Sequence, residues 1–151
     1  MPEVVIADTS CLIVLTKIGE LEVLRRLYGT VVTTPVVAAE FGRPLPAWIQ
    51  LESARNGRQE QELAKQLDAG ESSAIALGLE KPGSTVVLDD YKARRVADRL
   101  GVQLTGTLGV LIRATKAGVV PALRPILERM RETDFRFSHD LEAQALLAVG
   151  E

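Results

Sequence analysis

The sequence predicts an α/β domain in which a central parallel sheet of about four to five strands lies between two layers of helices. Short apolar or β-branched runs recur at residues 4–7, 30–33, 85–88 and 102–104. Runs without polar alternation are typical of strands that are buried on both faces. Segments with helical periodicity separate these runs, so right-handed crossovers and a three-layer α/β/α architecture are expected.

Composition limits the class of protein. The chain has 151 residues, which suits one domain over residues 1–151 with a core of its own. Its single cysteine, Cys11, excludes an internal disulfide, and no Cys/His cluster has zinc-site spacing. We expect a cytoplasmic protein, because the sequence shows neither a signal peptide nor an apolar run of about 18 residues that could cross a membrane. A net charge of −2 gives no overall attraction to nucleic acid.

The first part of the chain is predicted as strand 4–7, helices 11–18 and 20–27, strand 30–33 and helix 35–41. Gly19 separates the two early helices. Thr34 and Pro35 are a helix start, with Thr as N-cap and Pro at the first helical position, and Gly42 ends that helix. Residues 42–46 contain two prolines and are therefore expected to form a loop.

The rest is predicted as helices 58–67 and 68–79, strand 85–88, helix 91–100, strand 102–104, and helices 107–117, 121–130 and 138–149. Helix 91–100 has the clearest period. Its apolar residues recur on one stripe, and Lys92, Arg95 and Arg99 lie on the opposite face.

Acidic residues follow two of the predicted strands. Asp8 comes directly after residues 4–7, and Asp89 and Asp90 come directly after residues 85–88. Glu40 lies within an apolar helix, and Glu71 lies in the first turn of the helix before the third strand. Because the carboxyl ends of parallel strands meet at one edge, these five acids are expected to converge. Closely packed carboxylates repel one another unless a cation is present, and oxygen ligands without Cys or His favour Mg²⁺ or Mn²⁺.

Each acid also has a purely structural interpretation. Asp8 can offset the dipole of the following helix, and Asp90, assisted by Asp89, can cap helix 91–100. Asp68-x-x-Glu71 has the pattern of a capping box. The sequence argument for a site is that helix caps have no evident reason to gather at one edge.

Three hydroxyls flank the predicted acid site: Thr9, Ser10 and Thr107. All three can support the acids of a metal site, but helix capping is the expected role of Ser10 and Thr107. No histidine is available as a partner for Ser10, so a Ser-His-Asp hydrolase is not favoured.

Two other classes of acid-bearing α/β protein fit less well. A phosphoacceptor receiver domain needs its acid pair at the first strand, whereas here the pair follows the third. A haloacid-dehalogenase-type phosphatase needs Asp-x-Asp, whereas Asp8-Thr9-Ser10 has serine at the third position.

Four segments in order resemble the PIN-domain ribonucleases, the fold of the VapC-type toxins, in an uncharacterised prokaryotic branch. They are Val5-Ile6-Ala7-Asp8-Thr9-Ser10, Thr34-Pro35-Val36-Val37-Ala38-Ala39-Glu40, Glu71-Ser72-Ser73-Ala74-Ile75-Ala76-Leu77 and Leu88-Asp89-Asp90, with Gly101-Val102 and Gly106–Leu111 beyond them. The resemblance implies a PIN-like fold and a metal-dependent endoribonuclease in which Asp8, Glu40 and one or both of Asp89 and Asp90 bind Mg²⁺ or Mn²⁺. Glu71 departs from the pattern, because many relatives carry Asp there. A homodimer and, for a toxin, a small antitoxin protein are further implications.

The predicted catalytic residues are therefore Asp8, Glu40, Glu71 and Asp90, and metal binding adds Asp89. Cations held by these acids would polarise the scissile phosphate of an RNA substrate and activate water. Lys92 and Arg95 are expected to hold flanking phosphates, with a solvated helix face as the alternative. The competing functional hypothesis is a catalytically inactive PIN module that binds RNA or a protein partner.

Overall fold

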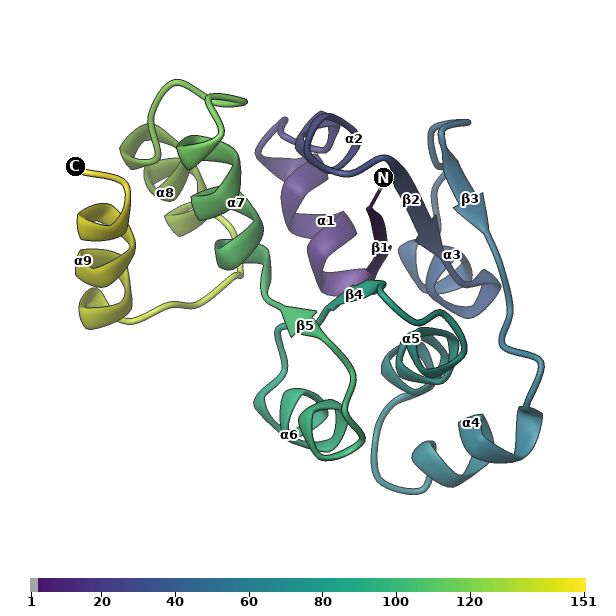
Figure 1. The fold of residues 1–151 in the computed structure, drawn as a ribbon. Helices are drawn as coiled ribbons and strands as arrows, with labels where there is room; N and C mark the ends of the chain where they lie inside the picture. Colours follow the sequence, from purple (N-terminus) through teal and green to yellow (C-terminus); the bar gives the residue numbers. More distant parts are fainter. Residues whose placement is uncertain (1–2) are drawn as a thin grey trace.

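A computed structural model describes residues 3–151 and contains a five-stranded parallel sheet flanked by helices (Figure 1). The strands are β1 (Val4–Ala7), β2 (Thr30–Thr33), β3 (Ile49–Leu51), β4 (Thr85–Val87) and β5 (Leu104–Thr105). The helices are α1 (Thr9–Lys17), α2 (Glu22–Leu27), α3 (Pro35–Phe41), α4 (Gly57–Leu63), α5 (Ala69–Glu80), α6 (Tyr91–Arg99), α7 (Thr107–Lys116), α8 (Arg124–Arg131) and α9 (His139–Ala148). The predicted α/β class and parallel sheet are confirmed.

The strand order is β3-β2-β1-β4-β5. The chain builds outward from β1 through β2 to β3, and then returns to place β4 on the other side of β1. The order of the strands therefore reverses between β1 and β4, where Ile6 pairs with Val86 and Ala7 with Val87. In an open parallel sheet, ligands bind beyond the carboxyl ends of the strands at such a reversal. Asp8 and Asp89 follow these two strands.

Alternate residues of the central strands face two separate cores, as expected for strands covered on both sides. Val5 and Ala7 pack in one core with residues of α1, α2, α7, α8 and α9. Ile6 packs in the other core with residues of α4, α5 and α6. These two groups of helices lie on opposite sides of the sheet (Figure 1), so the three-layer arrangement is confirmed.

The main element that the sequence analysis left unassigned is β3. It is only three residues long, and two of them, Gln50 and Leu51, are exposed. Its pairing with β2 defines it, since Val32 pairs with Gln50 and Thr33 with Leu51. A segment this short has no period of its own. Several helix ends also differ by a few residues; α1, for example, begins at Thr9 instead of residue 11.

No helix within residues 3–151 is long and apolar enough to cross a membrane.

Candidate active site

The five predicted acids, Asp8, Glu40, Glu71, Asp89 and Asp90, are called the acid cluster below. Asp8 is the most buried of them, with 4% of its surface exposed. It is the N-cap of α1, and its Oδ1 accepts a hydrogen bond from the backbone N–H of Cys11 at 2.9 Å. Asp8 was expected to offset the dipole of this helix, and the structure shows that it also caps it. The same residue follows β1 at the reversal point of the sheet.

The surroundings of Asp8 disfavour its charge. Burial raises the pKa of this carboxyl well above its usual value, and the negative charges of Asp89 and Glu71 raise it further. Hydrogen bonds from the backbone amides of Cys11 and Asp89 oppose the rise without cancelling it. Asp8, Asp89 and Glu71 are therefore near enough to repel one another, and a cation at this place would relieve the repulsion.

Asp89, which follows β4, is hydrogen-bonded to residues of α1 and α7. Its Oδ2 accepts hydrogen bonds from Ser10 Oγ at 3.0 Å and Thr107 Oγ1 at 2.6 Å, and its Oδ1 accepts from the Thr107 backbone N–H at 2.7 Å. The expected role of both hydroxyls in helix capping is wrong, because Asp8 caps α1 and Gly106 is the N-cap of α7. Ser10 and Thr107 instead hold Asp89.

Glu40 reaches the cluster from α3. Its Oε1 accepts a hydrogen bond from Thr9 Oγ1 at 2.5 Å, next to Asp8 in the sequence. The carboxylate also lies over Gly70, where any Cβ would collide with it. Beneath it, the buried hydroxyls of Thr34 and Ser73 are 2.6 Å apart in a hydrogen bond that ties the start of α3 to α5. Helix α3 therefore delivers Glu40 to the first turn of α5, where Glu71 lies.

Glu71 and Asp90 both begin helices. Glu71 and Asp68 form the predicted capping box, with Glu71 N–H donating to Asp68 Oδ1 at 2.7 Å. Asp90 caps α6 by accepting from the Ala93 backbone N–H at 2.9 Å. Burial, followed by the charges of Asp68 and Asp90, raises the pKa of Glu71 to about 7. Glu71 is thus electrostatically coupled to both Asp8 and Asp90.

The reasoning that caps have no cause to gather at one edge was wrong. In a parallel sheet each crossover helix starts near the carboxyl end of the preceding strand, so N-caps collect there. Asp8 and Asp90 illustrate this, since each follows its strand and caps the next helix. Capping and ligand binding are not exclusive, because a carboxylate has two oxygens and several lone pairs.

A better criterion is the absence of counterions. No salt bridge between described residues involves any member of the acid cluster. Carboxylates gathered without a basic partner, one of them buried, fit a hard divalent cation. Within residues 3–151 no three acidic, His or Cys side chains are already arranged as a ligand set. Metal binding would therefore require carboxylates such as Glu40 to rotate away from their present hydrogen-bond donors.

Removing the charge of Glu71 should flatten the dependence of stability on pH. Because the pKa of Glu71 is about 7 in the folded chain and 4.5 ordinarily, the native state binds the extra proton. The free energy of unfolding should thus fall as pH rises from 4.5 to 7. An unscreened shift of this size is worth about 3 kcal/mol, and partial exposure reduces it to about 1 kcal/mol.

The part of this loss that Glu71 causes should disappear in Glu71→Gln, which retains an oxygen acceptor for the capping box, while the part that Asp8 causes remains. The free energy of unfolding of both proteins is measured with urea at pH 5 and pH 8, in the presence of a chelator. The exposed Glu128→Gln on α8 is the control and should behave as the wild type. Equal pH dependence in wild type and Glu71→Gln would contradict the assigned surroundings of Glu71.

The basic residues of α6 point in different directions. Lys92 and Arg95 are exposed, as predicted, and the Arg95 guanidinium lies 5.7 Å from the centroid of the Tyr91 ring. Arg94, which the sequence analysis did not single out, turns back toward the cluster, and its Nη1 donates to the Leu88 carbonyl at 2.8 Å. Arg94, which helical periodicity alone did not mark, is therefore held beside the residue that precedes Asp89.

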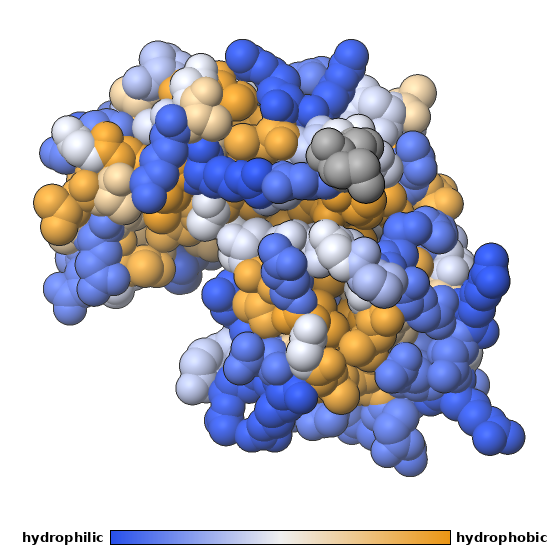
Figure 2. All heavy atoms as spheres, in the orientation of Figure 1, coloured by the Kyte–Doolittle hydropathy of each residue, from blue (hydrophilic) through white to orange (hydrophobic). Residues whose placement is uncertain are grey.

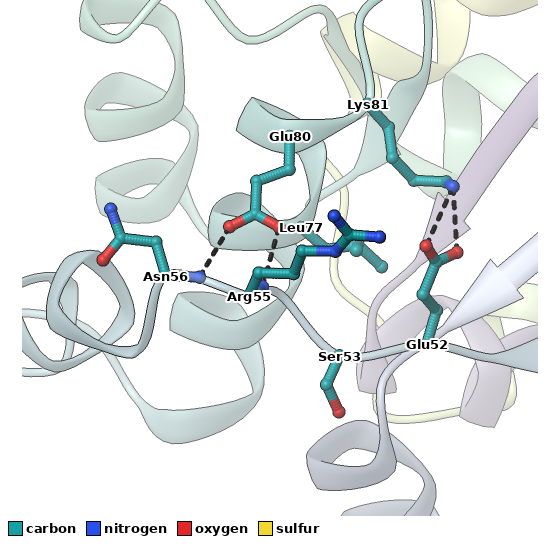
Figure 3. Close-up of a pocket in the computed structure, with 7 residues that line it drawn as sticks. All are labelled: Glu52, Ser53, Arg55, Asn56, Leu77, Glu80 and Lys81. Carbon is teal, nitrogen blue, oxygen red and sulfur yellow. Dashed lines mark hydrogen bonds and ion pairs between the residues drawn. The ribbon is translucent and has the colours of Figure 1, made fainter.

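A cavity of about 650 Å³ lies away from the acid cluster, between residues 52–56 and α5 (Figure 3). Three of its charged groups are engaged within the protein: Glu80 accepts from the backbone N–H groups of Arg55 and Asn56, and Lys81 pairs with Glu52. The two backbone hydrogen bonds hold the pKa of Glu80 below its usual value. This arrangement anchors the loop after β3 to α5, and the Arg55 guanidinium lines the cavity without a salt bridge to any described residue.

Comparison with known proteins gives one family. A protein-family model described as a PIN domain matches residues 4–151, which include all five strands and the whole acid cluster. Comparison with curated proteins gives no match.

Proposed function

Because the chain belongs to the PIN-domain family, we propose that it is a metal-dependent endoribonuclease whose acid cluster hydrolyses RNA phosphodiester bonds. Membership of this family supports a nuclease-type function in general. The observation that carries the finer proposal is the acid cluster itself: carboxylates without basic partners, at the reversal point of the sheet, with Asp8 buried among them.

The proposed roles follow from the positions of the side chains. Asp8, the most buried acid, would hold a divalent cation at the base of the site, and Asp89, fixed by Ser10 and Thr107, would be its least mobile neighbour. Glu40 and Glu71 would approach from α3 and α5. A bound Mg²⁺ or Mn²⁺ supplies charge for the scissile phosphate and lowers the pKa of water.

The alternative is a PIN module that binds RNA or protein without cleaving it. Incubation of the purified protein with end-labelled single-stranded RNAs, with Mg²⁺ or Mn²⁺ and with a chelator, separates the two. We expect the wild type to make internal cuts that require the metal. The Asp8→Asn variant should make none, and its purification in parallel excludes a contaminating nuclease. RNA binding without cleavage under every metal condition would favour the inactive module.

The exposed cations of α6 should contribute to RNA affinity. Replacing Lys92 and Arg95 by Ala removes two phosphate contacts, so fewer counterions are released on binding. The slope of log affinity against log salt should fall by roughly 1.4 for a single strand. The measurement uses Ca²⁺ to suppress cleavage, and the control is a double variant of exposed arginines on α2 and α4, Arg26→Ala with Arg58→Ala. Identical slopes for wild type and the Lys92/Arg95 variant would make these residues a solvated face.

A further inference from the structure

The carboxylate of Glu40 lies against the first turn of α5, in a place that a side chain of residue 70 would otherwise fill. Its Oε1 accepts a hydrogen bond from Thr9 Oγ1 at 2.5 Å. A Cβ at Gly70 would overlap Glu40 Oε1, and it would lie 2.9 Å from the carboxylate carbon and 3.2 Å from Oε2. We call this position of the carboxylate, between the Thr9 hydroxyl and the bare backbone of Gly70, the Glu40 seat.

The Glu40 seat exists because residue 70 is a glycine. The three atoms nearest to the place of its missing Cβ all belong to the Glu40 carboxylate, so any side chain at residue 70 would displace that carboxylate first. Gly70 is the second residue of α5 and its φ is not positive. Glycine is a poorer helix former than alanine. Helix geometry therefore gives no reason for glycine at this position, whereas the Glu40 seat does.

The acid cluster is open to solvent away from the Glu40 seat. A groove of about 480 Å³ has Asp89 on its wall, and none of the residues that line it belongs to α3 or α5. Figure 2 shows the surface hollowed between α6 and the α7–α9 part of the molecule. A cation that enters here can reach Asp89 while Glu40 stays in its seat.

Seating and ligation compete for the same carboxylate. Within residues 3–151 no three acidic, His or Cys side chains are already arranged as a ligand set, so Glu40 has to leave Thr9 before it can complete one. The observed affinity for a cation is then the intrinsic affinity reduced by the fraction of molecules in which Glu40 is free. Any interaction that stabilises the seat therefore weakens cation binding.

We propose that Thr9 and Gly70 are positioning residues, which hold Glu40 in a resting place in the absence of a cation and thereby lower the affinity of the acid cluster for Mg²⁺ or Mn²⁺. The inference rests on the proposed metal-dependent function, and it adds the residues that set how tightly the cation is bound. Weaker binding makes the occupancy of the site follow the concentration of free cation.

The dissociation constant for Mn²⁺ tests the Glu40 seat, measured on the full chain without RNA from the electron paramagnetic resonance signal of free Mn²⁺. Thr9→Val removes the hydrogen-bond donor and Gly70→Ala fills the space. Each should tighten binding about tenfold, the low end of the range for a hydrogen bond to a charged group. Because both changes empty the same seat, the double variant should bind no tighter than Gly70→Ala. Thr9→Ser, which keeps the hydroxyl, should stay within about twofold of wild type.

Two controls show whether the effect passes through Glu40. In a Glu40→Gln background, Gly70→Ala should leave the dissociation constant for Mn²⁺ unchanged, because residue 40 no longer supplies a carboxylate to the cation. Gly57→Ala is the matched glycine variant: it adds the same methyl group at the first residue of α4, where a Cβ would meet no atom within 4 Å. It should bind Mn²⁺ as the wild type does. Circular dichroism verifies that each variant is folded, and Thr9→Val carries the test if Gly70→Ala does not fold.

Unchanged or weaker Mn²⁺ binding in either folded variant would overturn the proposal, and weaker binding would make the seat the position from which Glu40 holds the cation. Equal tightening by Gly70→Ala in the Glu40→Gln background would overturn it as well. An RNA cleavage assay in Mn²⁺ separates these failures from failure of the proposed function. A wild type that cleaves RNA, with an Mn²⁺ affinity that does not respond to Gly70→Ala, would contradict the Glu40 seat alone. An affinity that responds to both variants in a protein that never cleaves RNA would contradict the nuclease alone.

Discussion

Asp8→Asn is expected to lower the rate of RNA cleavage by about a thousandfold and, in the absence of metal, to make the fold more stable. The loss of activity follows because Asp8 is the buried carboxylate on which the proposed metal site depends. The gain in stability follows because the charge of Asp8 is disfavoured by burial and by Asp89. Asn keeps an oxygen that can accept the Cys11 N–H bond, and it removes the charge.

Relief of one repulsion between nearby charges should raise the free energy of unfolding by about 1–2 kcal/mol. Because the pKa of Asp8 is raised in the folded chain, its carboxylate costs stability only above its ordinary pKa, and the full cost is reached above the raised value. The advantage of Asp8→Asn should therefore be largest at high pH and shrink on acidification.

The measurements are a cleavage assay in Mn²⁺ and urea unfolding in chelator over a pH series. Asp98→Asn is the matched control, since Asp98 is an exposed aspartate on α6; it should change neither activity nor stability beyond about 0.5 kcal/mol. Full cleavage by Asp8→Asn would remove Asp8 from the proposed site. A destabilised but inactive protein would contradict the electrostatic explanation.

Periodicity was sufficient to predict the architecture where a strand is buried on both faces. Residues 4–7, 30–33 and 85–87 are strands because wholly apolar or β-branched runs of this length fit only a covered sheet. It was insufficient for β3, an edge strand whose pairing with β2 defines it. The reversal between β1 and β4 also depends on pairing, which is a property of the folded chain and not of any local pattern.

The positions of Asp8, Asp89 and Asp90 were predictable because a carboxylate directly after a buried strand must emerge at the carboxyl edge of the sheet. Their partners were harder to predict. Ser10 and Thr107 are far apart in the sequence. Both reach Asp89 because β4 lies between β1 and β5, the strands that α1 and α7 follow.

Mn²⁺ is expected to raise the melting temperature of the wild type by about 5–10 °C at a concentration near 100 times its Kd. A ligand that binds only the native state stabilises it by mass action, which amounts to about 2.7 kcal/mol at that concentration. For a chain of this length each kcal/mol corresponds to about 2–4 °C. The shift needs no RNA, so it tests the metal site separately from the substrate.

The quadruple variant Asp8→Asn, Glu40→Gln, Glu71→Gln and Asp90→Asn should lose this shift. Asp89 is left in place because its hydrogen bonds to Ser10 and Thr107 hold α1, β4 and α7 together. A matched quadruple changes exposed acids outside the cluster: Asp98→Asn, Glu128→Gln, Glu132→Gln and Asp140→Asn. It alters net charge equally and should keep the shift.

The same shift should depend on pH in a direction set by Glu71. At pH 5 this carboxyl, with a pKa of about 7, is protonated in the metal-free protein, so Mn²⁺ must displace a proton in order to use it as a ligand. The shift at pH 5 should therefore be smaller than at pH 8 in the wild type. A shift that persists in the quadruple variant of the acid cluster would place the cation elsewhere. A shift that is the same at pH 5 and pH 8 would contradict Glu71 as a ligand, and it would count against Asp8 as well, because the pKa of Asp8 is also raised in the metal-free protein.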